Sequence, residues 1–434
     1  MSVNTTLEKL FKIAASDDVK SLDLLISEGV NLNQQRGNGR RLLHEATSCG
    51  SHKVLQNLLS KKIEVDGQDD AGLTALHMAA GKGDLVALEL LLEAGAKRDL
   101  RDGDGFSPLM RSAEEGQGEA ISILLSNGAQ VALQDDRKRN ALHLAVQSDD
   151  LKTVSKLIKA GIDIDLQDNE GISPLMLAAS ANNTDITQLL LDAKANVHSK
   201  SQLGDDALLM AVLAGAHDII GLLLSNGADL HAKNQEGCNA CHCAALSGRD
   251  DILPMLLEKG ASLSCDELGQ TALHMASYGG HFECMALLFS AGLSGNEKDN
   301  NGRTIAHIAA RRNNVELIKL LDEKKVQLDI EDDFGLSPAD YAVLGRNEEL
   351  LKILGSSADD EVRTFDPFMA AKCGLLPVLR FILNRTSDVE VCDDEGLSIL
   401  QHAFLGGCVS TANFLLSRGA NPLHRSNNGA TCLH

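Results

Sequence analysis

The stretch Thr74-Ala75-Leu76-His77-Met78-Ala79-Ala80 sets the pattern of the chain, because variants of it return at a fixed spacing. Asn140-Ala141-Leu142-His143 and Thr271-Ala272-Leu273-His274 are close copies. With the first residue of each copy as an anchor, the anchors fall at positions 8, 41, 74, 107, 140, 173, 206, 239, 271, 304, 337, 365, 398 and 431. Eleven of the thirteen intervals are 33 residues, one is 32 and one is 28. A period of about 20–50 residues is the signature of stacked repeats, so nearly the whole chain is one array.

Each anchor is predicted to begin a short helix. From position 41 onward, eleven of thirteen anchors are Ser, Thr, Asn or Asp, whose side chains accept hydrogen bonds from first-turn N–H groups. Pro follows at the first helical position in three units, Pro108, Pro174 and Pro338. A second apolar-periodic segment follows, and in eight units it ends at a Gly suited to a left-handed cap: Gly29, Gly95, Gly128, Gly161, Gly227, Gly260, Gly292 and Gly419. Another Gly two residues before most anchors predicts a tight turn. The predicted unit is hairpin, helix, turn, helix.

These motifs resemble the ankyrin repeat, most clearly at residues 72–80 and 226–230, and the resemblance covers essentially residues 1–434. It implies an all-α fold, an ankyrin-repeat α-solenoid whose helix-turn-helix units are joined by β-hairpin fingers, with the first helices on the concave side. One unit cannot bury its apolar face alone, so stacked units share a continuous core. We expect about 13 repeats plus a truncated one.

Two departures from the period predict the organisation of the array. We expect residues 1–354 to form a stack of about eleven repeats with a capping first repeat, 355–364 an irregular junction, and 365–434 a second short stack. A locally shortened hairpin explains the 28-residue interval equally well. The last anchor, Thr431, has no helical segment after it. We therefore expect the sequence to be a fragment with a truncated final repeat, and we expect this fragment to be a monomer.

The composition argues against several classes of protein. Lys and Arg number 40 against 61 Asp and Glu, a formal charge of −21, whereas a nucleic-acid binder needs a basic surface. No apolar stretch approaches the about 18 residues of a membrane span. Nearly all of the ten Cys are scattered singly, which indicates reduced thiols rather than a disulfide framework. We expect a cytoplasmic or nuclear protein that does not bind nucleic acid. We also expect no membrane span within residues 1–434.

The residues that look chemically active are better explained by the repeat. Cys238-Asn239-Ala240-Cys241-His242 matches a haem-attachment or zinc motif by letters, but Asn239 is an anchor and Cys241 takes the place of Leu in other units. Seven His recur one per unit in the fourth position, as a ladder that does not converge on a metal: His44, His77, His143, His242, His274, His307 and His434. The family resemblance implies that this His bonds neighbouring backbone and the anchor side chain. We expect no enzyme, no metal and no cofactor.

Surface positions carry the remaining signal. The seventh residue after the anchor is small or polar in units 74–173 but large in units 206–337, and hairpin tips of the same stretch are apolar. Aromatic and Arg side chains dominate binding energy at interfaces. A groove with apolar anchors and a cationic rim is predicted, formed by Leu203, Leu213, Leu246, Leu268, Tyr278, Arg303, Arg311, Arg312, Phe334 and Leu344. Packing of the Leu side chains between neighbouring helices explains the same pattern equally well.

Charged fingers are interpreted separately. Most are acidic, such as Asp102-Gly103-Asp104 and Asp332-Asp333, and are expected to form a solvated face that keeps the array soluble. One finger, Asp136-Arg137-Lys138-Arg139, is basic and lacks the turn Gly. It either contacts an acidic partner or is a drifted loop.

We conclude from the sequence that the chain is a non-catalytic scaffold or adaptor that binds a segment of a partner protein on the concave face. The alternative is the cytosolic N-terminal ankyrin region of a larger protein, whose remaining part is a channel, a kinase or a ubiquitin-ligase adaptor module. A third hypothesis is a hydrolase or a metal enzyme, but no sequence motif supports it.

Overall fold

The computed structural model describes residues 3–61, 63–345, 348–354, 366–372, 374–386 and 388–432. They form two compact units, residues 1–235 and 236–434. The expected junction at 355–364 and the ladder residue His434 lie outside the described residues, as does the side chain of Leu344.

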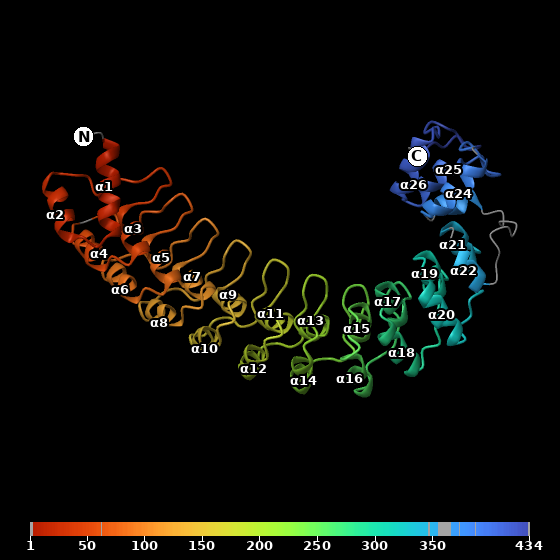
Figure 1. Cartoon of the computed structure of the whole chain (residues 1–434), viewed down its shortest axis with the longest axis horizontal. Helices are drawn as coiled ribbons and strands as arrows, with labels where there is room; N and C mark the ends of the chain where they lie inside the picture. Colours follow the sequence, from red (N-terminus) through yellow and green to blue (C-terminus); the bar gives the residue numbers. More distant parts are fainter. Residues whose placement is uncertain are drawn as a thin grey trace. The chain divides into compact units, whose positions relative to one another are not determined.

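The first unit is built from helix pairs. Its helices are α1 (Val3–Ala15), α2 (Val19–Ser27), α3 (Leu42–Cys49), α4 (His52–Leu59), α5 (Ala75–Lys82), α6 (Leu85–Glu93), α7 (Pro108–Glu114), α8 (Gly118–Ser126), α9 (Ala141–Gln147), α10 (Leu151–Lys159), α11 (Pro174–Ser180), α12 (Thr184–Asp192), α13 (Ala207–Ala214) and α14 (His217–Ser225). Successive odd-numbered helices contact one another, as do successive even-numbered helices. The unit is therefore two parallel rows of helices (Figure 1).

The second unit is also built from helix pairs. Its helices are α15 (Ala240–Leu246), α16 (Leu253–Glu258), α17 (Ala272–Gly279), α18 (Phe282–Ser290), α19 (Ile305–Arg311), α20 (Val315–Glu323), α21 (Pro338–Gly345), α22 (Glu348–Ile353), α23 (Pro367–Lys372), α24 (Leu376–Thr386), α25 (Ile399–Leu405) and α26 (Val409–Ser417). In both units the described loops that connect one pair to the next project as fingers beside the odd-numbered helices (Figure 1). We call the surface formed by the odd-numbered helices and the fingers the finger-side face.

The predicted caps are confirmed. Thr74 accepts from the N–H of His77 at the start of α5, and Asn140, Ser173 and Asp206 cap α9, α11 and α13 through their side chains. The eight Gly predicted to end second helices all have φ between +78° and +105°. Lys194 and Lys325 take the corresponding positions at φ +70° and +60°, where a side chain is strained. Local chemistry thus places the helix ends.

Apolar side chains from successive repeats make a shared core. Leu76, Ala79 and Ala80 of α5 are buried, as are their counterparts in α9 and α19. In the second unit, Leu336 and Tyr341 pack with Ala370 and Val378, so residues on both sides of the undescribed segment 355–365 belong to one hydrophobic cluster. The boundary at 355–364 stays a prediction.

The fingers are held by turns rather than by strands. Among the described residues, bridge pairing is limited to Gln35 with Arg41 and Cys392 with Ser398. Described fingers instead close through tight turns, as where the N–H of Gly302 donates to the carbonyl oxygen of Asp299 at 2.9 Å. Gly302 has φ +73°, and a Cβ there would lie 2.6 Å from the nitrogen of Asp333 on the next finger, so only Gly fits.

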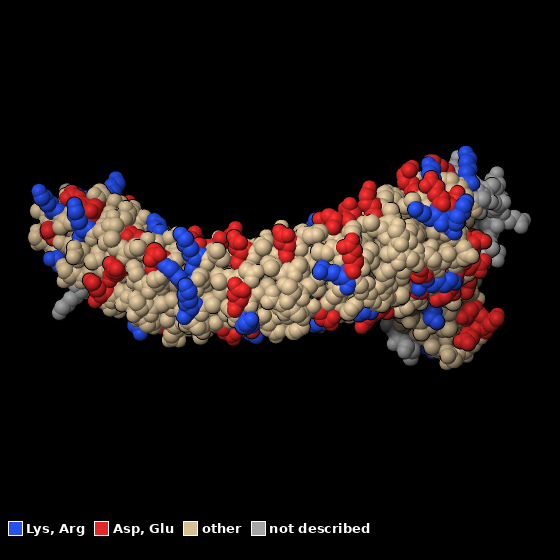
Figure 2. Space-filling model, turned by 90° about the horizontal axis from the view of Figure 1, so that it is seen from below, with Lys and Arg blue, Asp and Glu red and all other residues tan. Residues whose placement is uncertain are grey.

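Charge is interspersed on the molecular surface. On the face drawn in Figure 2, acidic and basic side chains alternate with uncharged surface, and neither unit presents a continuous basic stripe there. No helix in the described part of the chain is long and apolar enough to cross a membrane.

Candidate functional site

A buried Asp five residues before the anchor shapes each of the fingers that line the candidate site. One oxygen of Asp299 accepts the N–H groups of Asn301 and Arg303, each at 2.9 Å. Asp332 accepts those of Phe334 and Leu336 at 2.9 and 3.0 Å. Both Asp residues are only 5% exposed.

The prediction that finger carboxylates form a solvated face is therefore wrong for some of them. Asp102 and Asp332 are buried, because their backbone acceptor role pulls them under the finger. Asp104 stays exposed at the tip, as the prediction has it.

The second oxygen of each buried Asp holds a side chain of the finger-side face. Asp299 Oδ2 accepts from Arg303 Nε at 2.9 Å and pairs with its terminal nitrogen at 2.7 Å. Asp332 Oδ2 accepts from the Tyr341 hydroxyl at 2.7 Å. The sequence suggested that Arg303 is a free cation on the rim of the groove. Its charge is instead matched by the buried carboxylate of Asp299.

These side chains line a cleft of about 320 Å³. Tyr278 of α17, Arg303 of the finger and Arg311 and Arg312 at the end of α19 are all in its wall, together with His307, Ile308 and Tyr341. Four of the ten predicted residues thus converge. The chain has only two Tyr, and both line this cleft.

The inner wall of the cleft is fixed by hydrogen bonds. Thr304 N–H donates to His307 Nδ1 at 3.0 Å, and His307 Nε2 donates to the Leu336 carbonyl oxygen at 3.0 Å. Burial lowers the pKa of His307, so the ring is neutral at pH 7. The rings of His307 and Tyr341 meet edge to face with centroids 5.8 Å apart. Both ring nitrogens are used, which confirms the structural role expected for the His ladder.

Titration of the other groups follows from the same contacts. Burial raises the pKa of Tyr341 well above its usual value, and the hydrogen bond to Asp332 raises it further. Burial also acts to raise the pKa of Asp299, but the bonds from Arg303 and the backbone outweigh it, so the pKa lies below its usual value. His307, Tyr341 and Asp299 therefore each keep one charge state at neutral pH.

Arg311 and Arg312 differ from Arg303. Both are exposed, and neither forms a salt bridge with a carboxylate among the described residues. Arg311 is the last residue of α19 and Arg312 is its C-cap, where a positive charge also favours the helix dipole.

The other predicted residues whose side chains are described lie outside the cleft. Leu246 and Leu268 of the second unit are 48% and 61% exposed. Phe334 is half-buried against the cluster of Leu336 and Tyr341, so packing describes it better than exposure. In the first unit, Leu203 is 70% exposed at a finger tip and Leu213 is 36% exposed on α13.

Sequence reasoning missed Tyr341, His307 and Ile308 as wall residues and Asp299 and Asp332 as the groups behind them. Tyr341 stands four residues after its anchor, where seven other units carry Met, Leu or Ile. That departure, together with an Asp five residues before the anchor, was the available signal.

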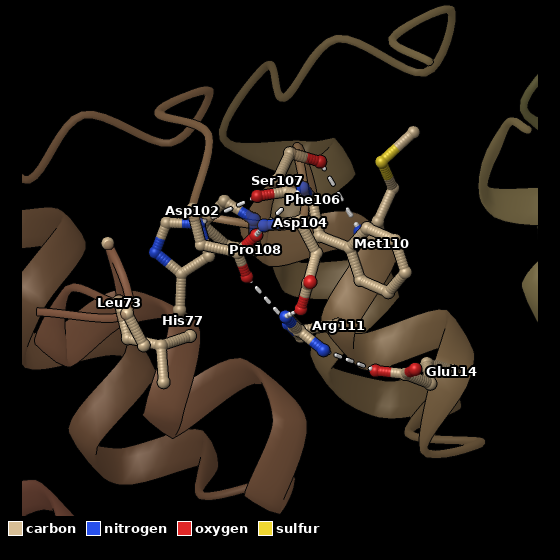
Figure 3. A network of polar contacts seen from close by, with 12 residues as sticks. Leu73, His77, Asp102, Asp104, Phe106, Ser107, Pro108, Met110, Arg111 and Glu114 are labelled. Carbon is tan, nitrogen blue, oxygen red and sulfur yellow. Dashed lines mark hydrogen bonds and ion pairs between the residues drawn. The ribbon is translucent and has the colours of Figure 1, made fainter. Parts of the chain in front are cut away.

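The first unit has its own polar network, centred on Arg111 of α7. Figure 3 shows Arg111 among Asp102, Asp104 and Glu114, at nitrogen to oxygen distances of 2.7, 2.6 and 2.8 Å. Its guanidinium also lies 4.3 Å from the centroid of the Phe106 ring. This network borders a more open cleft of about 700 Å³, whose wall includes His77, Lys82, Glu115 and Gln117.

The haem-like sequence has the geometry of an ordinary repeat. Asn239 Oδ1 accepts the N–H groups of Cys241 and His242, and His242 Nε2 donates to the Gln270 carbonyl oxygen at 3.0 Å. Cys241 is fully buried, and burial raises the pKa of its thiol to about 11. No group of three or more metal-ligating side chains is found among the described residues.

The basic finger keeps the repeat geometry without its Gly. Lys138 takes the turn position at φ +62°, and Arg139 Nε donates to the buried Asp135 at 2.8 Å. The positive charge of Arg139 is therefore neutralised within the finger by Asp135.

Comparisons with known proteins agree with this architecture. A family model for ankyrin repeats in three copies matches residues 10–102, 62–135, 82–168, 142–234 and 208–299, and one for ankyrin repeats in many copies matches residues 280–321. A solved structure of the human ASB11 ankyrin repeat domain is similar, with 29% identity and a TM-score of 0.47 over 51% of this chain and 98% of that one. No curated protein matches the chain. The family matches cover more than half of the sequence, and the chain therefore belongs to the ankyrin repeat family.

Proposed function

We propose that this protein is a non-catalytic interaction scaffold that holds a segment of a partner protein on the finger-side face of its second unit. Ankyrin repeats are in general protein–protein interaction modules. The observation that carries the proposal is the cleft in which Tyr278, Arg303, Arg311 and Arg312 converge. Tyr and Arg are the side chains that most often dominate interface energetics.

Exposed apolar side chains extend the proposed surface. Leu268 on a finger tip and Leu246 at the end of α15 belong to the same unit and the same face as the cleft. They would supply apolar contact beside the cationic cleft. Leu203 and Leu213 are proposed as partner contacts of the first unit.

The mechanism proposed is rigid display. The cleft wall is fixed by the bonds of His307, Arg303 and Tyr341, so binding would order few additional side chains. Because each immobilised flexible side chain costs about 0.5–1.5 kcal/mol on association, a preformed wall keeps more of the contact energy as affinity.

The test is affinity purification from cells with residues 1–434 as bait, beside the double variant Tyr278→Ala, Arg311→Ala. The matched control is Glu316→Ala, Lys319→Ala, which changes the exposed surface of α20 in the second row of helices. Circular dichroism and thermal unfolding establish that all three proteins fold alike. We expect a partner that is captured by the parent and the control and lost from the cleft variant. Equal capture by all three would refute the assignment of the cleft.

A further inference from the structure

Two Arg side chains of the cleft, Arg311 and Arg312, have no acidic partner among the described residues and differ from their counterparts in other units. The two residues that correspond to Arg311 and Arg312 are Glu114 and Glu115 in the unit of α7 and Gln147 and Ser148 in that of α9. The whole chain carries a formal charge of −21. Two adjacent cations without described acidic partners, lining one cleft of an acidic protein, indicate attraction to an external anion.

The charges around the cleft favour a single negative charge on the occupant. Arg303, Arg311 and Arg312 contribute three positive charges, and His307 is neutral. Asp299 and Asp332, directly bonded to the wall, contribute two negative charges. The net charge of these five groups is about one positive charge. One carboxylate would neutralise it, whereas a phosphate dianion would leave an excess negative charge.

The size and walls of the cleft favour a side chain over a larger group. Its volume of about 320 Å³ is at the lower end of the about 300–1,000 Å³ of small-ligand pockets. Tyr278 and Tyr341 supply flat walls, and the Tyr278 hydroxyl is already oriented by a hydrogen bond from Gln270 Nε2 at 3.2 Å. Guanidinium groups bind carboxylates through paired, charge-assisted hydrogen bonds.

We propose that the cleft binds a partner segment that presents one Asp or Glu side chain, whose carboxylate is bound by Arg311 and Arg312 between the two Tyr residues. This inference rests on the proposed function and adds to it the chemistry of the occupant. Arg303, held by Asp299, acts in it as a wall residue rather than as the primary ligand.

The two Tyr residues make the cleft directly observable. The protein contains no Trp and only two Tyr, so labelling with 3-fluorotyrosine places both fluorine signals in this cleft. The variants Tyr278→Phe and Tyr341→Phe assign the two resonances. Any peptide that shifts them binds at the cleft or alters it, and a peptide bound elsewhere leaves them in place.

The probe is a displayed library of random, unmodified 12-residue peptides selected against the 1–434 protein. Selected peptides are synthesised and screened by the fluorine signals. We expect cleft-binding peptides to share one Asp or Glu, and their affinity to fall about tenfold or more when that residue is replaced by its amide. In the Arg311→Gln, Arg312→Gln variant the same replacement in the peptide should have little further effect on affinity. That result would show that the peptide carboxylate and the Arg pair interact directly. Arg311→Lys, Arg312→Lys should retain part of the affinity by charge.

Other outcomes separate the two proposals. Peptides that shift the fluorine signals without a shared acid or coupling to the Arg pair would overturn the carboxylate inference and leave the proposed function standing. Binding that appears only when the acid is replaced by phosphoserine would also overturn it, in favour of a dianion. If no selected peptide perturbs the cleft, both the inference and the proposed function of the cleft are refuted.

Discussion

The clefts beside α7 and α19 use the same repeat positions for opposite purposes. In the first unit, Arg111 stands four residues after its anchor and is surrounded by Asp102, Asp104 and Glu114. In the second, the corresponding site of α21 carries Tyr341, which donates to Asp332 without adding a charge. The cationic side chains there are Arg311 and Arg312, which line the cleft without a described acidic partner.

The difference shows two ways in which one scaffold satisfies a buried Asp, with or without the charge of an Arg. Both fingers need a buried Asp to accept backbone N–H groups, and its second oxygen must also be satisfied. An Arg does so at Asp102 and uses its charge within the fold. A Tyr does so at Asp332, and the neighbouring Arg311 and Arg312 form no salt bridge among the described residues.

The largest expected effect distinguishes the two buried Asp residues. Asp102→Asn keeps the backbone bonds but turns an amide N–H toward Arg111 Nε. We expect a local loss of about 2–3 kcal/mol, below the about 3–5 kcal/mol of a fully buried pair because Arg111 keeps two other carboxylates. Asp332→Asn should cost only about 0.5–1.5 kcal/mol, since the Tyr341 hydroxyl is neutral and can reorient.

Hydrogen exchange of the fingers at 99–116 and 329–345 measures these local opening energies, which a single global unfolding energy would not resolve in a repeat array. Asp104→Asn is the control, because its side chain is 71% exposed while it binds the same Arg111. Equal losses at Asp102 and Asp332 would show that charge is not what distinguishes the two fingers.

Alkaline titration is the next test. In a Tyr278→Phe variant, Tyr341 is the one remaining Tyr, and its raised pKa predicts little phenolate at pH 10 while the protein is folded. Because the folded-state pKa is raised, the stabilisation is fully present below pH about 10 and is lost as pH rises toward the folded-state value. Ultraviolet absorbance follows the phenolate, and Asp332→Ala in the same background should bring ionisation to lower pH. Ordinary titration of Tyr341 in the folded protein would contradict the buried bond to Asp332.

The ladder His provides a smaller, shared effect, since His77 and His307 each line one of the clefts. Burial lowers the pKa of both, so their stabilisation is present above about pH 6.5 and declines as pH falls through the lower folded-state values. Gln401 shows a substitute that does not titrate, because it accepts from Ser398 N–H and donates to the Ala430 carbonyl oxygen at 2.8 Å.

We therefore expect His77→Gln or His307→Gln to change stability by under about 1 kcal/mol at pH 7.5 and to reduce the loss on acidification. Thermal unfolding at pH 7.5 and pH 5 measures both quantities. His52→Gln, at a half-exposed His outside the ladder, is the control. An unchanged acid sensitivity in both ladder variants would exclude these rings as its source.

The smallest effects are expected at the exposed charges. Glu114→Gln removes a partly exposed partner of Arg111 and should cost about 0.2–0.5 kcal/mol. Arg311→Gln should change stability by no more than about 0.5 kcal/mol, because it removes no described ion pair. Urea unfolding of the two variants beside the parent protein measures both. A loss well above 1 kcal/mol for Arg311→Gln would mean that its charge supports the fold and is not held in reserve for a ligand.

Part of the candidate site was predictable. The large side chains at the seventh position identified Tyr278 and Arg311, because that position is exposed or half-buried in all first helices where its side chain is described. Phe334 and Arg303 were assigned to the surface, but Phe334 packs on a cluster and Arg303 is paired with Asp299. Both errors have one cause, since neither the burial of Asp299 nor the neighbours of Phe334 can be deduced within a single repeat.

The sequence by itself determined the repeat, its helix ends and its caps. Helix ends and caps depend on local backbone conformation and hydrogen bonding, which residues such as Thr74, Pro108 and Gly95 provide within one unit. The 33-residue spacing repeats these residue types along the array. Only the tertiary structure decided which side chains meet. Tyr278, Arg311 and Tyr341 come from three successive repeats, and their convergence depends on how those repeats stack and rotate in space. The cleft beside Arg111 therefore holds a neutralised network, whereas the cleft beside Arg311 holds two Arg side chains without a described acidic partner.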